Sequence, residues 1–136
     1  MINLDLSQYT DQELSLLIKD ATDLFEQRQG FSFDEKTEYG DIYRYNKKGQ
    51  FHNTRGPAVI LADGSVEYYV NGKCHRTDGP AVIQADGRTE YWVNGKLHRT
   101  DGPAIIYADG TLEYWVDGTF IEEEEFNQKY GKEVNI

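Results

Sequence analysis

Apolar residues near the N-terminus recur at three- and four-residue intervals, which is the spacing of one face of an α-helix. The residues of this stripe are Leu14, Leu17, Ile18, Ala21, Leu24 and Phe25. Thr10 and Glu13 form a capping-box pattern before it, and Gly30 supplies a stop after it. We therefore expect an amphipathic helix over residues 10–29, with Leu16, which lies off the stripe, exposed. The apolar face could pack on the protein's own sheet or mediate self-association.

Farther along the chain the sequence repeats itself with a period of 23 residues. Three kinds of position mark the period: His52, His75 and His98; Pro57, Pro80 and Pro103; and the Asp-Gly pairs that begin at Asp63, Asp86 and Asp109. Such a period is typical of repeat proteins, in which one unit cannot bury its own apolar face and stacks on its neighbours.

Each period contains two hairpin turn signals, an Asp-Gly pair and then an Asn-Gly pair that becomes Asp-Gly in the last copy. Two turns predict two strands. In the second copy we expect them over residues 81–85 and 88–93, with residues 96–99 as a short continuation. Enrichment of Tyr, Trp and Val in the second strand supports this assignment.

Alternation along the strands predicts which side chains share a face. Nine positions form three matching trios that we expect to be buried: Ala58, Ile60 and Ala62; Ala81, Ile83 and Ala85; Ala104, Ile106 and Ala108. The positions between them differ from copy to copy, so the opposite face is expected to meet solvent or a partner. In the second strand, Tyr69, Trp92 and Trp115 point away from the face that carries Tyr68, Tyr91 and Tyr114.

These patterns predict a mainly β fold with flanking helices. Antiparallel β-hairpins with a 23-residue period would stack on their neighbours. We expect one domain over residues 1–136, divided into an N-terminal helical segment (1–36), the hairpin repeats (37–120) and a C-terminal cap (121–136). The cap would be a short helix from Glu122 to Tyr130 that protects the open edge of the last hairpin.

The stretch from Trp92 to His98, Trp-Val-Asn-Gly-Lys-Leu-His, is followed by Asp109-Gly110 and by Glu113-Tyr114-Trp115. In this order of motifs, residues 49–120 resemble the MORN repeat family, and the resemblance implies β-hairpin units stacked into a long twisted sheet. The segment from His75 to Pro80, His-Arg-Thr-Asp-Gly-Pro, departs from the family's usual His-Gly-x-Gly. It is similar to a variant subgroup found in small bacterial and phage repeat proteins. The family's association with phospholipids is not expected here, because no basic patch supports it.

The chain carries a formal charge of −10, from 14 Lys and Arg against 24 Asp and Glu. This balance disfavours direct binding to nucleic acid or to an anionic membrane. Cys74 is the only cysteine, so no intramolecular disulfide can form, which suits a reducing cytoplasm. The first fifteen residues lack the pattern of an export signal, and no apolar run is long enough to cross a bilayer. We expect a cytoplasmic location, in a bacterium or an infected host cell.

Three sets of residues are candidates for chemistry. The three histidines would stand about 9.6 Å apart on stacked units, too far for one zinc ion, and we expect them to hydrogen-bond near turns. Cys74 reads as a small filler, since Phe51 and Leu97 stand at its position in other copies. Glu67, Glu90 and Glu113 could form an acid–base pair. We favour instead a solvated ladder partnered by Arg76 and Arg99, and we expect no catalytic residue, metal or cofactor.

We therefore expect a non-enzymatic protein-binding module, a small bacterial or phage regulator or inhibitor that meets its partner with the outer face of the sheet. The contact residues would be Leu61, Tyr69, Gln84, Trp92, Tyr107 and Trp115. One alternative is an acidic inhibitor that imitates nucleic acid for a DNA- or RNA-binding target. A second is a hydrolase that uses paired carboxylates. Homo-oligomers could form through the N-terminal helix or a sheet edge.

Overall fold

The computed structural model describes residue 7, residues 10–16 and residues 33–131. Residues 11–16 are helical. The remaining elements are β1 (Phe33–Lys36), β2 (Ile42–Tyr45), β3 (Val59–Ile60), β4 (Val66–Glu67), β5 (Tyr69–Val70), β6 (Lys73–Cys74), β7 (Val82–Ile83), β8 (Thr89–Glu90), β9 (Trp92–Val93), β10 (Lys96–Leu97), β11 (Ile105–Ile106), β12 (Leu112–Val116), β13 (Thr119–Ile121) and α2 (Glu123–Tyr130).

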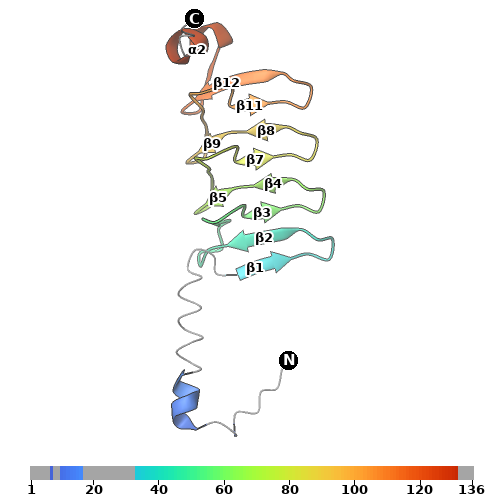
Figure 1. The fold of residues 1–136 in the computed structure, drawn as a ribbon, viewed down its shortest axis with the longest axis vertical. Helices are drawn as coiled ribbons and strands as arrows, with labels where there is room; N and C mark the ends of the chain where they lie inside the picture. Colours follow the sequence, from blue (N-terminus) through green and yellow to red (C-terminus); the bar gives the residue numbers. More distant parts are fainter. Residues whose placement is uncertain (1–6, 8–9, 17–32, 132–136) are drawn as a thin grey trace, which may run out of the picture.

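Nine of the strands form one antiparallel sheet in the order β1-β2-β3-β4-β7-β8-β11-β12-β13. The pairs β5–β6 and β9–β10 form two small antiparallel ribbons beside it. Successive hairpins lie one beyond the other along the longest axis of the molecule, and α2 lies past the last of them (Figure 1). The prediction of a mainly β protein with antiparallel strands and flanking helices is confirmed. Most strands are shorter than expected, and the segment predicted as 81–85 is β7, Val82–Ile83.

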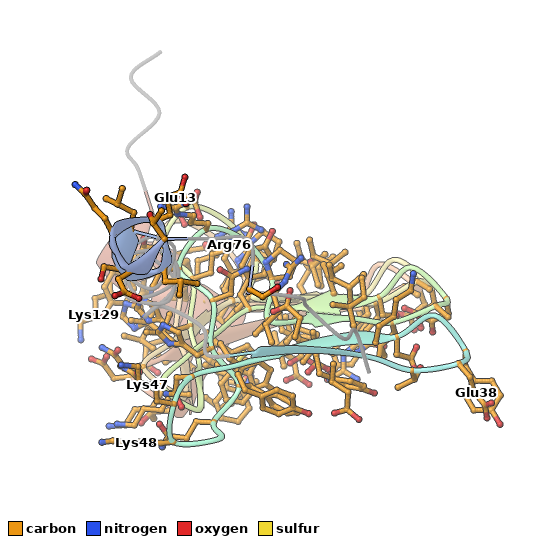
Figure 2. The ribbon with its side chains drawn as sticks, turned by 90° about the horizontal axis from the view of Figure 1, so that it is seen from below. Glu13, Glu38, Lys47, Lys48, Arg76 and Lys129 are labelled. Carbon is orange, nitrogen blue, oxygen red and sulfur yellow. The ribbon has the colours of Figure 1, made fainter. Side chains whose placement is uncertain are left out.

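The hairpins have turns at two opposite edges of the sheet, and the turns at one edge share a backbone conformation. Asn71, Asn94 and Asp117 adopt positive φ angles of 48°, 50° and 50°, each followed by a glycine that is also positive in φ. That pair of angles fits a tight turn whose twist matches the flanking strands, which explains why Asn-Gly and Asp-Gly recur there. In a view along the stack, Glu38 lies at one edge of the hairpins and Lys47 and Lys48 lie at the other (Figure 2).

The histidines connect each turn to the preceding hairpin. The Nδ1 atom of His52 accepts the backbone N–H of Asn71 at 2.9 Å, and His75 accepts that of Asn94 at 3.0 Å. His98 accepts the N–H of Asp117 at 3.0 Å. These bonds confirm the predicted structural role of the histidines near turns.

The pairs of tyrosine and arginine on one side of the sheet correct a prediction. The Arg76 guanidinium lies 4.1 Å from the centre of the Tyr68 ring, and that of Arg99 lies 3.9 Å from the Tyr91 ring. Both arginines also donate to a proline carbonyl in their own loop. Arg76 and Arg99 therefore do not partner the glutamates, because the loop after each histidine carries them to the opposite face.

The expected burial of whole Ala-Ile-Ala trios is wrong at the third position. Ala58, Ala81 and Ala104 are fully buried, but Ala62, Ala85 and Ala108 are exposed. The strands are only two residues long, so Ala62 already belongs to the turn. Val59, at 3% exposure, is buried on the other face of β3, and its counterparts Val82 and Ile105 are buried as well. The buried core therefore includes side chains on both faces of the sheet, at the paired strands and the residue just before each of them.

The two ends of the chain agree with the predictions in part. The Thr10–Glu13 capping box is present: the N–H of Glu13 donates to Thr10 Oγ1 at 3.2 Å, and the N–H of Thr10 donates to Glu13 Oε2 at 2.7 Å. Leu16 is 56% exposed, as expected. The rest of the predicted stripe, from Leu17 to Phe25, lies outside the described residues. The sheet begins with β1 at Phe33, inside the segment predicted as helical.

The C-terminal helix packs on the last long strand. Phe126 is buried at 3% exposure, and its ring centre lies 4.5 Å from that of Tyr114 on β12. Tyr114 has no arginine over its ring among the described residues, so α2 covers the position that Arg76 and Arg99 cover in earlier units. Within the described part of the chain, no helix combines the length and the apolar character that a membrane span requires.

The histidine bonds predict a pH dependence of stability. Burial lowers the pKa of His52, since the imidazolium is poorly solvated there, and protonation would also remove the acceptor at Nδ1. The unfolded chain therefore binds the proton more tightly than the folded chain. The contribution of neutral His52 to the free energy of unfolding is complete above about pH 6.5, and the free energy of unfolding decreases as the pH drops below that value. Urea unfolding between pH 8 and pH 5 should show this decline. It should be smaller in a His52→Gln variant, and equal slopes in both proteins would contradict the assignment.

The cap predicts a large loss of stability on truncation. Phe126→Ala removes a buried ring from the Tyr114 contact and should lower the free energy of unfolding by about 3 kcal/mol. Gln128→Ala, on an exposed position of the same helix, should change it by less than about 0.5 kcal/mol. Equilibrium urea denaturation of both variants measures the difference, and similar midpoints would show that α2 does not support the sheet.

Candidate binding face

The residues predicted to contact a partner lie on one face of the sheet, which we call the aromatic face. It carries Leu61, Tyr69, Gln84, Trp92, Tyr107 and Trp115, together with Glu67, Glu90 and Glu113. The strand register places them there: Val82 stands opposite both Glu67 and Glu90, and Ile105 stands opposite both Glu90 and Glu113. Side chains two positions along from these residues share their face.

Each glutamate of the aromatic face holds the ring that follows it by two residues. Glu67 Oε2 accepts the Tyr69 hydroxyl at 3.0 Å, and Glu90 Oε2 accepts the Trp92 indole N–H at 2.7 Å. Glu113 Oε2 accepts the Trp115 indole N–H at 2.9 Å. Burial, followed by the charge of Glu67, raises the pKa of Tyr69, so its hydroxyl remains a donor. The rings are thus fixed in orientation while they stay half-buried.

An arginine of the same chain occupies the aromatic face between the β7–β8 hairpin and the β11–β12 hairpin. Arg88 forms an ion pair with Glu90 Oε1, and its guanidinium carbon lies 4.9 Å from the centre of the Tyr107 ring. The Tyr107 hydroxyl donates to Glu113 Oε1 at 2.9 Å, and this hydrogen bond raises the pKa of Tyr107. Both oxygens of Glu90 and both oxygens of Glu113 are therefore engaged within the protein.

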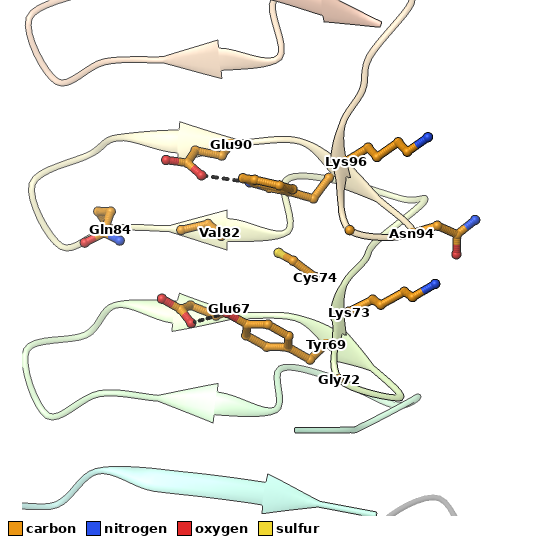
Figure 3. A pocket seen from close by; sticks show the side chains of 12 residues that line it. Glu67, Tyr69, Gly72, Lys73, Cys74, Val82, Gln84, Glu90, Asn94 and Lys96 are labelled. Atoms are coloured by element: carbon orange, nitrogen blue, oxygen red, sulfur yellow. Dashed lines mark hydrogen bonds between the residues drawn. The ribbon is translucent and has the colours of Figure 1, made fainter. Parts of the chain in front are cut away.

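A groove of about 710 Å³ opens on the aromatic face between the β3–β4 hairpin and the β7–β8 hairpin. Tyr69 and Trp92 line it, with Gln84, Glu67 and Glu90 also among its walls. Cys74 lies between the two hairpins at this groove (Figure 3). The groove brings together three of the predicted contact residues. Tyr107 and Trp115 meet at Glu113 instead, and Leu61 shares the face without lining the groove.

The Cys74 thiol does not behave as a nucleophile in this setting. Burial raises its pKa to about 12, and the charges of Glu67 and Glu90 add to the effect. The thiol therefore stays protonated at neutral pH and is a poor nucleophile. This agrees with the interpretation of Cys74 as a small filler.

Two further rings, those of Phe51 and Phe120, belong to the aromatic face and were not predicted from the sequence. Phe51 lies 5.3 Å from both Tyr45 and Tyr69 between ring centres, and Phe120 lies 5.6 Å from Trp115 with 47% of its surface exposed. Phe51 and Phe120 occupy the positions of Cys74 and Leu97 in the 23-residue period. The 23-residue spacing could have identified both rings. They extend the aromatic face toward both ends of the sheet.

The residues that the structure describes bring no three His, Cys, Asp or Glu side chains close enough to hold a metal ion. The glutamates hydrogen-bond to rings on their own chain, and the histidines hydrogen-bond to backbone N–H groups. The arrangement therefore presents ordered apolar and acidic surface.

Comparison of the sequence with models of known protein families finds no family that matches it. Comparison with curated proteins finds no protein that matches it.

Proposed function

We propose that this protein is a non-enzymatic binding module that captures a partner protein on the aromatic face. In this proposal it acts as a small regulator or inhibitor in the cytoplasm of a bacterium or of a phage-infected cell, as the resemblance to bacterial and phage repeats suggests. Its scaffold is a stack of 23-residue hairpin units of the MORN-like kind, extended into an elongated twisted sheet. The recurrence of the histidine and glutamate hydrogen bonds at that spacing supports the stack.

The observation that carries the proposal is the row of immobilised, partly exposed rings. Tyr and Trp contribute most to many protein interfaces because they bury a large apolar area and still offer a polar group. Here Tyr69, Trp92 and Trp115 are already oriented by their glutamates. A partner therefore loses less conformational entropy on the protein's side when it binds, which favours affinity.

The same hydrogen bonds favour binding over hydrolysis. A pair of catalytic carboxylates needs one group to donate a proton and the other to act on water or substrate. Glu90 and Glu113 each use both oxygens within the protein, in bonds to Trp92 and Arg88 and to Trp115 and Tyr107. Acid–base work at either residue would require these contacts to break.

The proposal predicts that loss of two rings abolishes partner binding. A tagged Trp92→Ala/Trp115→Ala variant should fail to capture the protein that the native chain pulls from a lysate of its own host. With that protein identified by mass spectrometry and purified, each single substitution should raise Kd by at least about 30-fold, since exposed aromatic contacts at an interface centre contribute about 2 kcal/mol or more.

Tyr39→Ala is the matched control, because Tyr39 is 77% exposed and lies in the turn after β1, away from the aromatic face. It should bind normally. Circular dichroism should show that all variants keep the β-structure. Unchanged capture by the folded double variant would refute the proposal.

A further inference from the structure

We propose that the groove between Tyr69 and Trp92 holds an arginine side chain of the partner protein, with the guanidinium paired to Glu67. This inference rests on the proposed function and names the chemistry that the aromatic face recognises. Three observations support it: an equivalent arginine bound within the protein, an unpaired carboxylate oxygen, and the placement of charges around the groove.

The protein already holds one arginine in the neighbouring position on the same face. Arg88 pairs with Glu90 and lies over Tyr107, so it lies between the β7–β8 hairpin and the β11–β12 hairpin. Its guanidinium is planar, and it can pair with a carboxylate while stacking on a ring. The aromatic face is thus demonstrably able to bind a guanidinium through one glutamate and one aromatic ring.

One period earlier, between the β3–β4 hairpin and the β7–β8 hairpin, the corresponding position has no arginine. Ser65 stands there in place of Arg88, is 1% exposed, and accepts the Ala85 N–H at 2.9 Å. Gln84 stands in place of Tyr107. Two large side chains are thereby replaced by smaller ones, and Gln84 lines the groove of about 710 Å³ together with Glu67.

Glu67 differs from Glu90 and Glu113 in how many contacts its carboxylate makes within the protein. Its Oε2 accepts the Tyr69 hydroxyl, but among the described residues no donor reaches its Oε1. Glu90 and Glu113 each have both oxygens bonded. A charged donor from a partner would complete the set, and a carboxylate that is partly buried beside apolar rings binds such a donor more strongly than one in open water.

Within the groove, Glu67 is the carboxylate that no cation of the described residues pairs with. Lys73 and Lys96 extend away from Glu67 and Glu90, toward the opposite edge of the hairpins (Figure 3). Both lysines line the groove, but among the described residues neither forms an ion pair with Glu67, and Glu90 is already paired with Arg88. Tyr69 and Trp92 stand on units roughly 9.6 Å apart, so a guanidinium can lie flat against one ring and still reach Glu67. Lysine could pair with Glu67, but its ammonium cannot stack in this way.

The test uses the full-length ¹⁵N-labelled protein and a blocked peptide, acetyl-Gly-Gly-Arg-Gly-Gly-amide. The indole N–H signals of Trp92 and Trp115 are separate probes, assigned with a Trp92→Phe variant. The arginine peptide should shift the Trp92 signal in a saturable manner and leave Trp115 unchanged, because Arg88 and Tyr107 fill the space beside Trp115's glutamate. A peptide with citrulline in place of arginine keeps the shape without the charge and should cause no saturable shift.

Two variants test the site itself. Glu67→Gln should weaken the arginine peptide roughly tenfold, as expected for loss of a charge-assisted bond, while Glu38→Gln, at an exposed turn, should leave binding unchanged. Ser65→Arg/Gln84→Tyr copies the occupied position into the empty one and should abolish binding by filling the groove. If that double variant does not fold, the Glu67→Gln and citrulline comparisons still decide the matter.

The outcomes separate this inference from the proposed function. Equal shifts with arginine and citrulline, no saturable shift, or full binding by Glu67→Gln would each overturn the arginine site. Partner capture that still depends on Trp92 and Trp115 would in that case leave the proposed function standing. Displacement of the captured partner by the arginine peptide, and not by the citrulline peptide, would support both.

Discussion

The inner hairpins of this protein depend on hydrogen bonds to their neighbours, because strands of two residues are too short to be stable alone. β3 and β4 share two residue pairs, and β4 shares two more with β7 in the following unit. An isolated two-stranded hairpin is marginal in water even when it is longer. The histidine bond from each unit to the next turn adds a third connection. His98 makes the same bond to the backbone of Asp117.

The two ends of the stack show what replaces a missing neighbour. In the first unit Arg44 takes the place of Tyr68, since its N–H donates to Ala58 as that of Tyr68 donates to Ala81. Arg44 and Asn53 then both donate to the Pro57 carbonyl, where a stacked pair of tyrosine and arginine would otherwise lie. At the other end Phe126 covers the last tyrosine. The cap and the first unit thus protect the same side of the sheet by different contacts.

The sequence predicts what is set by local geometry and by alternation. The Thr10–Glu13 cap, the Asn-Gly turns and the common face of Tyr69 and Trp92 follow from spacings within one helix turn or one strand. The position of Arg76 does not, because a loop carries it to the other face and periodicity says nothing of a loop's path. The exposed third alanine of each trio was missed for a related reason, since alternation does not reveal where a strand gives way to its turn.

The two faces of the sheet have different roles. Side chains of the aromatic face can therefore differ from one unit to the next while the strand pairing stays the same. The scaffold is held by main-chain ladders, by histidines and by tyrosines stacked on arginines on the other side. At the variable position of the aromatic face, Ser65 bonds to the next unit's backbone, whereas Arg88 reaches across to Tyr107. Both choices are compatible with the same strand register. Arg88 with Tyr107 closes the face, whereas Ser65 with Gln84 leaves a groove open, so two positions in each unit together determine where a groove forms.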